Sequence, residues 1–234
     1  MSFLEKTDMA GVRMASKVLL DAVDITPGEI EIFVQHPYTN SLFAMDAKGK
    51  MLTLTKEEDY QVWHDNICRL IDKSDLAQIF TILINAPWYL TWLKMIKSYL
   101  SKEDFSIWLG EAWTQEENPN MDCNVSITEA IKWFKEADPK ALMEEDEYAY
   151  WESLPDEVEL WRGVGVGRRK YGLSFTANEE TAVWFRDRWK SMGDECSMLY
   201  AKVPKKYCLA YFNRRNEDEI VVNVNAIKKY IKEV

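Results

Sequence analysis

The chain has 234 residues with a formal net charge of −10, and 47 % of them are hydrophobic, including ten Trp and eleven Tyr. This length and this share of apolar side chains predict a folded globular protein of one or two domains and exclude a disordered chain. The sequence has no apolar run of the ~20 residues that a membrane span needs, and its start lacks the apolar core of a signal peptide, so we expect a cytoplasmic protein.

The pattern of residues 1–154 is typical of a mainly helical region with a small strand element. It predicts a helix over 1–26, a strand over 29–35 and a hairpin of 41–45 with 50–55. From Thr55, which is spaced for a capping box with Glu58, apolar residues recur at the helical period. These stripes predict the packed core of helices that start near Thr55, Leu76, Leu90, Ser101, Ser126 and Asp138.

A boundary is predicted at Leu154-Pro155-Asp156, and strand patterns dominate after it. Strands are expected over 158–162, 173–175, 198–203, 207–212 and 219–224. Thr176 and Glu179 have the spacing of a capping box, and Asn225 is a candidate cap for a closing helix. We therefore expect an α+β protein with a helical region over 1–154 and a sheet domain over 155–234.

The charges are divided unevenly between these parts. Residues 1–160 contain 14 Lys and Arg against 30 Asp and Glu, a balance of −16, whereas residues 161–234 contain 15 against 9, a balance of +6. Acidic surfaces repel nucleic acid and membranes, so we expect neither as a partner. The basic part suits an anionic ligand.

The sequence offers few metal ligands. It contains two histidines, and its four cysteines lack the close spacing of zinc or redox motifs. We therefore expect no metal site, and buried free thiols in a reducing compartment. These residues are His36, His64, Cys68, Cys123, Cys196 and Cys208.

Three polar motifs stand at predicted strand edges in the last third of the chain. Arg162 lies in Trp-Arg-Gly, Ser174 in Ser-Phe-Thr, and Glu217 and Glu219 in Glu-Asp-Glu. An arginine binds phosphate oxygens bidentately. On an extended segment, Glu217 and Glu219 would face one side while Asp218 points away. Such a pair suits a cation-like sugar centre, as in cleavage of the nicotinamide–ribose bond of NAD.

In this order, the motifs resemble those of the arginine-type mono-ADP-ribosyltransferases over about the last eighty residues. The resemblance implies a mixed-sheet, NAD-binding domain over 155–234, with NAD between two packed sheets. By this resemblance Arg162, followed by Gly163, contacts the phosphates and supports the nicotinamide ribose. Glu219 bonds the ribose 2′-hydroxyl and stabilises the developing cation, and Glu217 orients or deprotonates the acceptor.

The resemblance also implies roles for the residues between these motifs. The segment Ser174-Phe175-Thr176 organises the cleft, with Ser174 holding the ribose and the catalytic glutamate. Thr176 has an equally weighted alternative, which is to cap the following helix. Tyr171 and Trp184 are candidates for stacking on nicotinamide, and of the two Trp184 is expected in the core instead. The segment 211–216 would be the turn that meets the target.

The resulting function is transfer of ADP-ribose from NAD to a protein side chain, arginine in particular, as in compact bacterial and phage transferases that modify host proteins. Two alternatives stay open from the sequence. The first is a binding or inhibitor protein without turnover, in which the acidic helical region holds a basic partner. The second is an NAD glycohydrolase, which transfers ADP-ribose to water.

Overall fold

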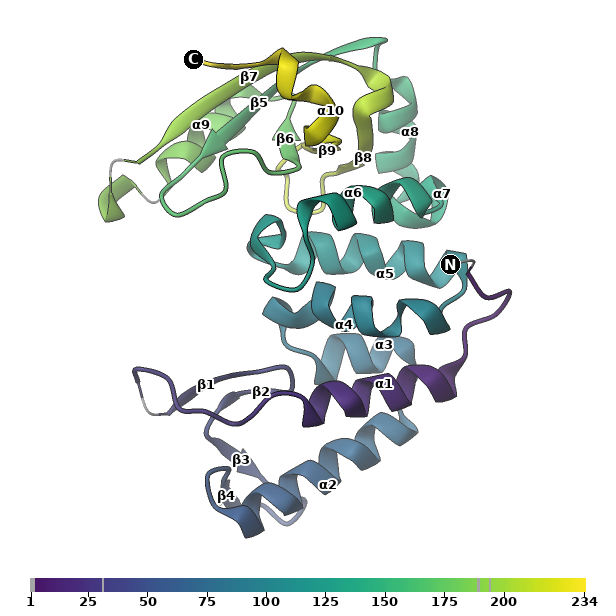
Figure 1. The fold of residues 1–234 in the computed structure, drawn as a ribbon, viewed down its shortest axis with the longest axis vertical. Helices are drawn as coiled ribbons and strands as arrows, with labels where there is room; N and C mark the ends of the chain where they lie inside the picture. The colour runs from purple at the N-terminus through teal and green to yellow at the C-terminus, as the bar shows by residue number, and fades with distance from the viewer. Residues whose placement is uncertain (1–2, 31, 189, 194) are drawn as a thin grey trace. The chain divides into compact units, whose positions relative to one another are not determined.

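The computed structural model describes residues 3–30, 32–188, 190–193 and 195–234. It confirms an α+β protein with a helical N-terminal and middle region and a six-stranded C-terminal sheet (Figure 1). The contacts divide the chain into two compact units. The first comprises Met1–Phe105 with Gln115–Glu117, and the second comprises Ser106–Thr114 with Asn118–Val234. Residues 106–114 and 118–154 thus group with the sheet and not with the preceding helices.

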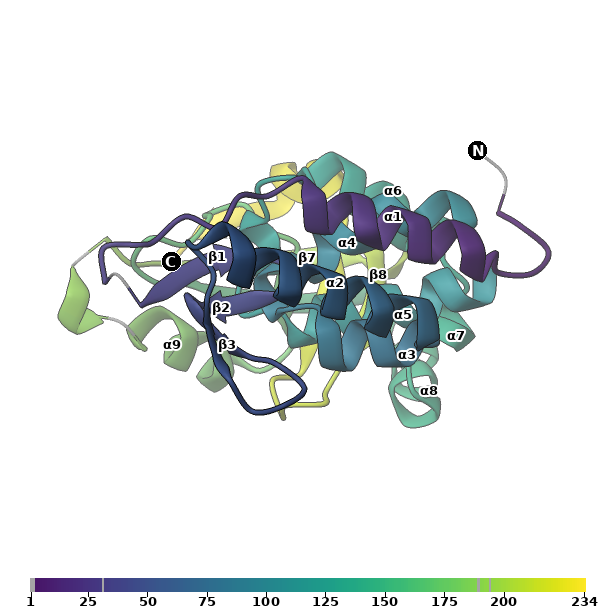
Figure 2. The same cartoon turned by 90° about the horizontal axis from the view of Figure 1, so that it is seen from below.

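The first unit is built on helices whose apolar faces meet. Its helices are α1 (Met9–Asp21), α2 (Glu57–Lys73), α3 (Leu76–Gln78), α4 (Tyr89–Ile96) and the start of α5 (Lys102–Gln115). Asp8 caps α1 by accepting the N–H of Ala10, so this helix starts later than predicted. Helix α1 packs against α4 and α2, as Figure 2 also shows, and buries Leu20 and Trp92 completely. A π-helical turn, Ile79–Leu83, follows α3.

Two small antiparallel hairpins complete this unit. The first pairs β1 (Phe33–His36) with β2 (Thr39–Ser41), and the second pairs β3 (Phe43–Met45) with β4 (Met51–Thr53). The predicted hairpin around residues 46–49 is therefore confirmed. The predicted capping box at Thr55 is wrong, because the N-cap of α2 is Lys56, which makes no side-chain cap bond.

Several helices of the second unit precede its sheet, whereas α9 (Glu179–Asp187) and α10 (Val224–Ile227) lie between its strands. Besides most of α5, the preceding helices are α6 (Ile127–Glu136), α7 (Pro139–Leu142) and α8 (Glu145–Ser153). Helices α6 and α7 start near Ser126 and Asp138, as predicted, and the side chains of these two residues cap them. Helices α6 and α8 pack on β8 (Cys208–Phe212), so the sheet buries its residues against helices that the sequence boundary had assigned elsewhere.

The sheet is antiparallel at every pairing, so the predicted mixed sheet is wrong. Its spatial order is β10 (Ile231–Glu233), β7 (Ser197–Pro204), β5 (Glu157–Val164), β6 (Ser174–Thr176), β9 (Glu219–Val222) and β8. The prediction of a closing helix capped by Asn225 is also wrong in part. Helix α10 (Val224–Ile227) is one short turn capped by Asn223 instead of Asn225, and the chain then returns as β10.

Helix α9 (Glu179–Asp187) lies against β5 at Gly163. A Cβ atom at this glycine would come 1.8 Å from the carbonyl oxygen of Ala182, so only glycine lets the helix approach the strand so closely. The cap of α9 is Asn178, whose side chain accepts two backbone N–H groups, so the predicted cap at Thr176 is wrong. Trp184 is exposed on α9 and not in the core.

The four cysteines are free thiols, but only Cys208 is buried. The predicted burial is therefore wrong for Cys68, Cys123 and Cys196. Among the helices that the structure describes, none is long and apolar enough to cross a membrane.

Candidate functional site

Arg162 lies on the buried side of β5, alternating with more exposed neighbours, and only 8 % of it is exposed. Its guanidinium donates to three backbone carbonyls of the β5–β6 connection and β6: Nη1 to Ser174 (2.6 Å), Nη2 to Arg169 (2.8 Å) and Nε to Lys170 (3.2 Å). A guanidinium has five N–H groups, so among the residues that the structure describes these bonds leave two for another acceptor. Burial lowers the pKa of Arg162 to about 10, which leaves it charged at neutral pH.

Ser174 joins Arg162 to Glu219 through its two oxygens. Its backbone carbonyl accepts from Arg162, and its hydroxyl lies close enough to the Glu219 carboxylate to favour the charged form of that group. Strand β6 makes this possible because it lies between β5 and β9, with Thr176 directly opposite Glu219. The structure thus brings together the arginine, the serine and the second glutamate that the sequence singles out.

Glu219 starts β9 with a half-buried carboxylate. Burial raises its pKa, hydrogen bonds from Ser174 and Trp113 oppose this rise, and the negative charge of Glu217 adds to it. The indole Nε1 of Trp113 lies 2.9 Å from Oε1 of Glu219. The result is a carboxylate held by two donors in surroundings that make it a stronger base than an ordinary glutamate.

The backbone turns between Glu217 and Glu219. The predicted extended segment over 217–219 is therefore wrong. Asp218 has a left-handed backbone, with φ at 49°, and so has Asn216, with φ at 56°. The Asp218 N–H donates to Asn213 Oδ1, and the Tyr211 hydroxyl donates to the Asp218 carboxylate at 2.7 Å. The pleat alternation is therefore broken at Asp218, although Glu217 stays close enough for its charge to affect the pKa of Glu219.

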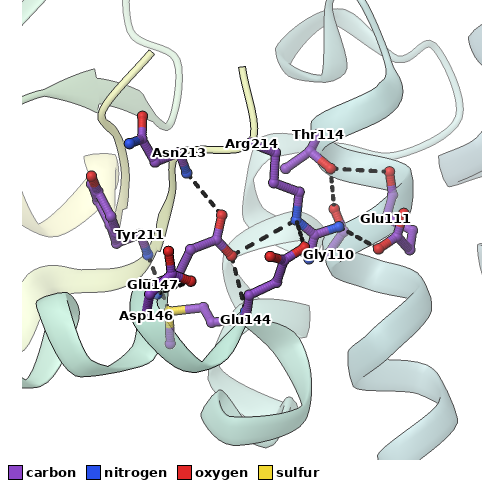
Figure 3. A network of polar contacts seen from close by, with 10 residues as sticks. Gly110, Glu111, Thr114, Glu144, Asp146, Glu147, Tyr211, Asn213 and Arg214 are labelled. Carbon is purple, nitrogen blue, oxygen red and sulfur yellow. Dashed lines mark hydrogen bonds and ion pairs between the residues drawn. The ribbon is translucent and has the colours of Figure 1, made fainter. Parts of the chain in front are cut away.

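Arg214 anchors this turn to two helices of the same unit (Figure 3). Its guanidinium forms ion pairs with Glu111 of α5, with Glu144 (3.5 Å) and with Glu147 of α8 (3.7 Å). Glu147 is only 3 % exposed and also accepts the N–H of Asn213 at 2.8 Å. The largely buried guanidinium of Arg214, with its three acidic partners, therefore anchors the turn that precedes Glu217 and Glu219.

The other predicted site residues have different surroundings. Gly163 faces α9, and Phe175 is buried in the core. Thr176 is buried beside Glu219, and its hydroxyl accepts the N–H of Asn178. Tyr171 is 44 % exposed and lies under the Lys228 ammonium, at 5.7 Å. Thr176 therefore joins the Arg162, Ser174 and Glu219 group, whereas the contacts of Gly163, Phe175 and Tyr171 point elsewhere.

Two polar residues of the site were not predicted. Trp113 belongs to α5, and Asn120 to the 3₁₀ turn Pro119–Met121, which the sequence indicated only as a loop. Asn120 donates to the Ser174 hydroxyl at 2.8 Å and accepts the N–H of Leu173. Gly172 leaves room for these contacts, because a Cβ there would lie 2.6 Å from Nη2 of Arg162 and 2.7 Å from Oδ1 of Asn120.

Comparisons with protein-family models, with curated proteins and with solved structures found no match to this chain. A carboxylate of raised pKa beside a buried guanidinium can stabilise a positive centre and bind an anion at adjacent positions.

Proposed function

We propose that this chain transfers ADP-ribose from NAD to a protein side chain, arginine in particular. The contact that carries the proposal is Ser174, which links the Arg162 guanidinium to the Glu219 carboxylate. NAD presents a pyrophosphate and a ribose that becomes cation-like when nicotinamide leaves. One guanidinium and one carboxylate joined through a serine match these two demands.

The charges around Arg162 support an anionic ligand. Burial is the main cause that lowers the pKa of Arg162, the negative charge of Glu219 opposes it, and the positive charge of Arg168 adds to it, so the two guanidinium groups are close enough to repel each other. Groups of like charge held together favour binding of a ligand of opposite charge, because the ligand relieves their repulsion. A pyrophosphate, with two negative charges, is such a ligand for Arg162 and Arg168.

In the proposed reaction the bond between the nicotinamide nitrogen and C1′ of the ribose breaks, and nicotinamide leaves with the bonding electrons. Glu219 stabilises the positive charge that develops on the sugar. The acceptor guanidine nitrogen then bonds to C1′ and loses a proton to Glu217, which acts as the general base. The products are nicotinamide, ADP-ribosyl-arginine and one proton.

Glu219→Gln tests the proposal, because it removes the charge and keeps the size of the side chain. We expect nicotinamide release from NAD to fall by about 10²–10³-fold, the loss typical of a removed electrostatic contact to a transition state. Nicotinamide is measured by chromatography, and ADP-ribose on an arginine-containing peptide by mass spectrometry. Glu180→Gln, on the exposed face of α9, is the matched control and should keep full activity.

The same assay separates the proposal from its rivals. Nicotinamide release without ADP-ribose on the peptide or on lysate proteins would make the chain an NAD glycohydrolase. Absence of both products, with no heat of NAD binding in calorimetry, would leave a protein that binds a partner without turnover. Full activity of Glu219→Gln would overturn the catalytic role of that residue.

A further inference from the structure

Trp113 is buried, and its indole N–H is directed at the Glu219 carboxylate. The side chain is 1 % exposed, and its ring meets Phe134 of α6 edge-on at 5.0 Å. An indole N–H can only donate, and a buried donor needs an acceptor. The acceptor is the Glu219 carboxylate, so the hydrogen bond restrains the carboxylate as well as the indole.

Asn120 orients the Ser174 hydroxyl, which lies beside the Glu219 carboxylate. Its Oδ1 accepts the N–H of Leu173, so its Nδ2 must be the donor to the Ser174 hydroxyl. Since that oxygen accepts from Asn120, the single Ser174 proton is free to point to the Glu219 carboxylate. Asn120 thus donates to Ser174, whose remaining proton favours the charged Glu219 carboxylate, and Trp113 donates to the same carboxylate directly.

We infer that Trp113 and Asn120 are positioning residues for Glu219, supplied by helical segments that precede the region resembling the transferases. The inference rests on the proposed function for the reaction that Glu219 serves. Two donors on one carboxylate fix its plane and favour its charged form. Neither Trp113 nor Asn120 needs to contact NAD for this effect.

Trp113→Phe removes the donor and keeps an aromatic ring in the core. We expect the kcat of nicotinamide release to fall about tenfold or more, in line with loss of a hydrogen bond to a charged group. The acid limb of the pH–rate profile should also move to higher pH, because the lost donor had favoured the ionised carboxylate. An unchanged profile in a folded Trp113→Phe protein would overturn the inference.

Trp151→Phe is the matched control. The indole Nε1 of Trp151 donates to the backbone carbonyl of Cys208 at 3.0 Å. Both residues belong to the same unit as Trp113, but a backbone carbonyl does not titrate. This variant loses the same donor from the same residue type and should leave the acid limb in place. A shift of equal size in both variants would indicate a general packing effect and count against a specific role for Trp113.

A second measurement needs neither the Trp113 variant nor activity. In ¹⁵N-resolved NMR spectra of the unmodified protein, the Trp113 indole N–H signal should move with pH as Glu219 titrates. The Trp151 signal should stay constant, and Glu219→Gln should abolish the movement. If no NAD is consumed but the Trp113 signal titrates, the proposed function fails while the contact stands; a Trp113 signal independent of pH overturns the positioning role.

Discussion

Glu217 and Glu219 are two positions apart, yet their surroundings differ. Glu219 is held by two neutral donors, whereas Glu217 lies at the turn and pairs with Arg215 at 3.2 Å. The side chain of Glu217 keeps 22 % of its surface exposed, so an incoming acceptor can compete with Arg215 for it. This difference supports separate roles, with one carboxylate for the sugar and one for the acceptor.

Glu217→Ala is expected to separate transfer from hydrolysis. Transfer to an arginine peptide should fall by about 10²-fold, the typical contribution of a general base, whereas NAD cleavage by water should stay within about threefold. Water needs no oriented acceptor, so its attack depends less on this residue. Both products are quantified in one reaction mixture, and an equal loss of the two would exclude an acceptor-specific role for Glu217.

At this scale the sequence predicts the charged and hydroxyl groups of the site better than their geometry. Arg162, Ser174 and Glu219 could be selected because each lies within or at an end of a predicted strand. The left-handed Asp218 was missed, although Asn and Asp adopt this conformation more readily than other side chains. Trp113 and Asn120 could not be selected, because their partners lie about 106 and 54 positions away in the sequence.

The β8–β9 turn is the element on which both glutamates depend. Arg214→Met should lower the free energy of unfolding by roughly 2–3 kcal/mol, somewhat below the loss for a fully buried ion pair, since 19 % of the Arg214 side chain is exposed. The loss arises because Glu147 would stay buried without its cation. The free energy is measured by urea denaturation followed by tryptophan fluorescence.

Arg215→Met provides the neighbouring control for this prediction. Arg215 is exposed and pairs only at the surface, with Glu217, so its replacement should cost less than about 1 kcal/mol. The double variant Arg214→Met, Glu147→Gln should recover part of the stability, because it removes the unpaired charge. Equal stability of the two single variants would show that the Arg214 network does not hold the turn.

Strands and helices were predictable as elements because each has its own apolar period. The pairing of the strands was not, because spatial order and direction depend on contacts between distant segments. The mixed sheet was therefore wrong although all five predicted C-terminal strands exist. The cap of α9 failed for a local reason, since Thr176 is part of β6 and Asn178 is the first residue able to cap the helix.

For the whole molecule, His36 links stability to pH. This residue is fully buried, with Nε2 at 3.3 Å from the Leu20 carbonyl and Nδ1 accepting the N–H of Tyr38 at 3.1 Å. One ring nitrogen donates and the other accepts, so the neutral ring satisfies both contacts. Burial lowers the pKa of His36 from its ordinary value of 6.5. The folded protein therefore binds this proton less readily than the unfolded chain.

The free energy of unfolding should accordingly decrease as the pH falls below about 6.5, towards the lower pKa of the folded state, and the His36 contribution should be complete above 6.5. Glu219 acts in the opposite direction, because its raised pKa favours the folded state at acid pH. Urea denaturation at several pH values between 5 and 7.5 measures the sum. Comparison with His36→Gln isolates the histidine, and a pH dependence that this variant leaves unchanged would contradict the prediction.

Helix α5 has its residues divided between the two compact units, with Ser106–Thr114 in the unit of the sheet. A fragment trimmed to the strand-rich end of the gene product would leave behind Glu111 and Trp113, and with them partners of Arg214 and Glu219. A fragment meant to keep this site intact should therefore start upstream of Ser106. A search for distant homologues that uses only the last eighty residues would likewise leave out Glu111 and Trp113.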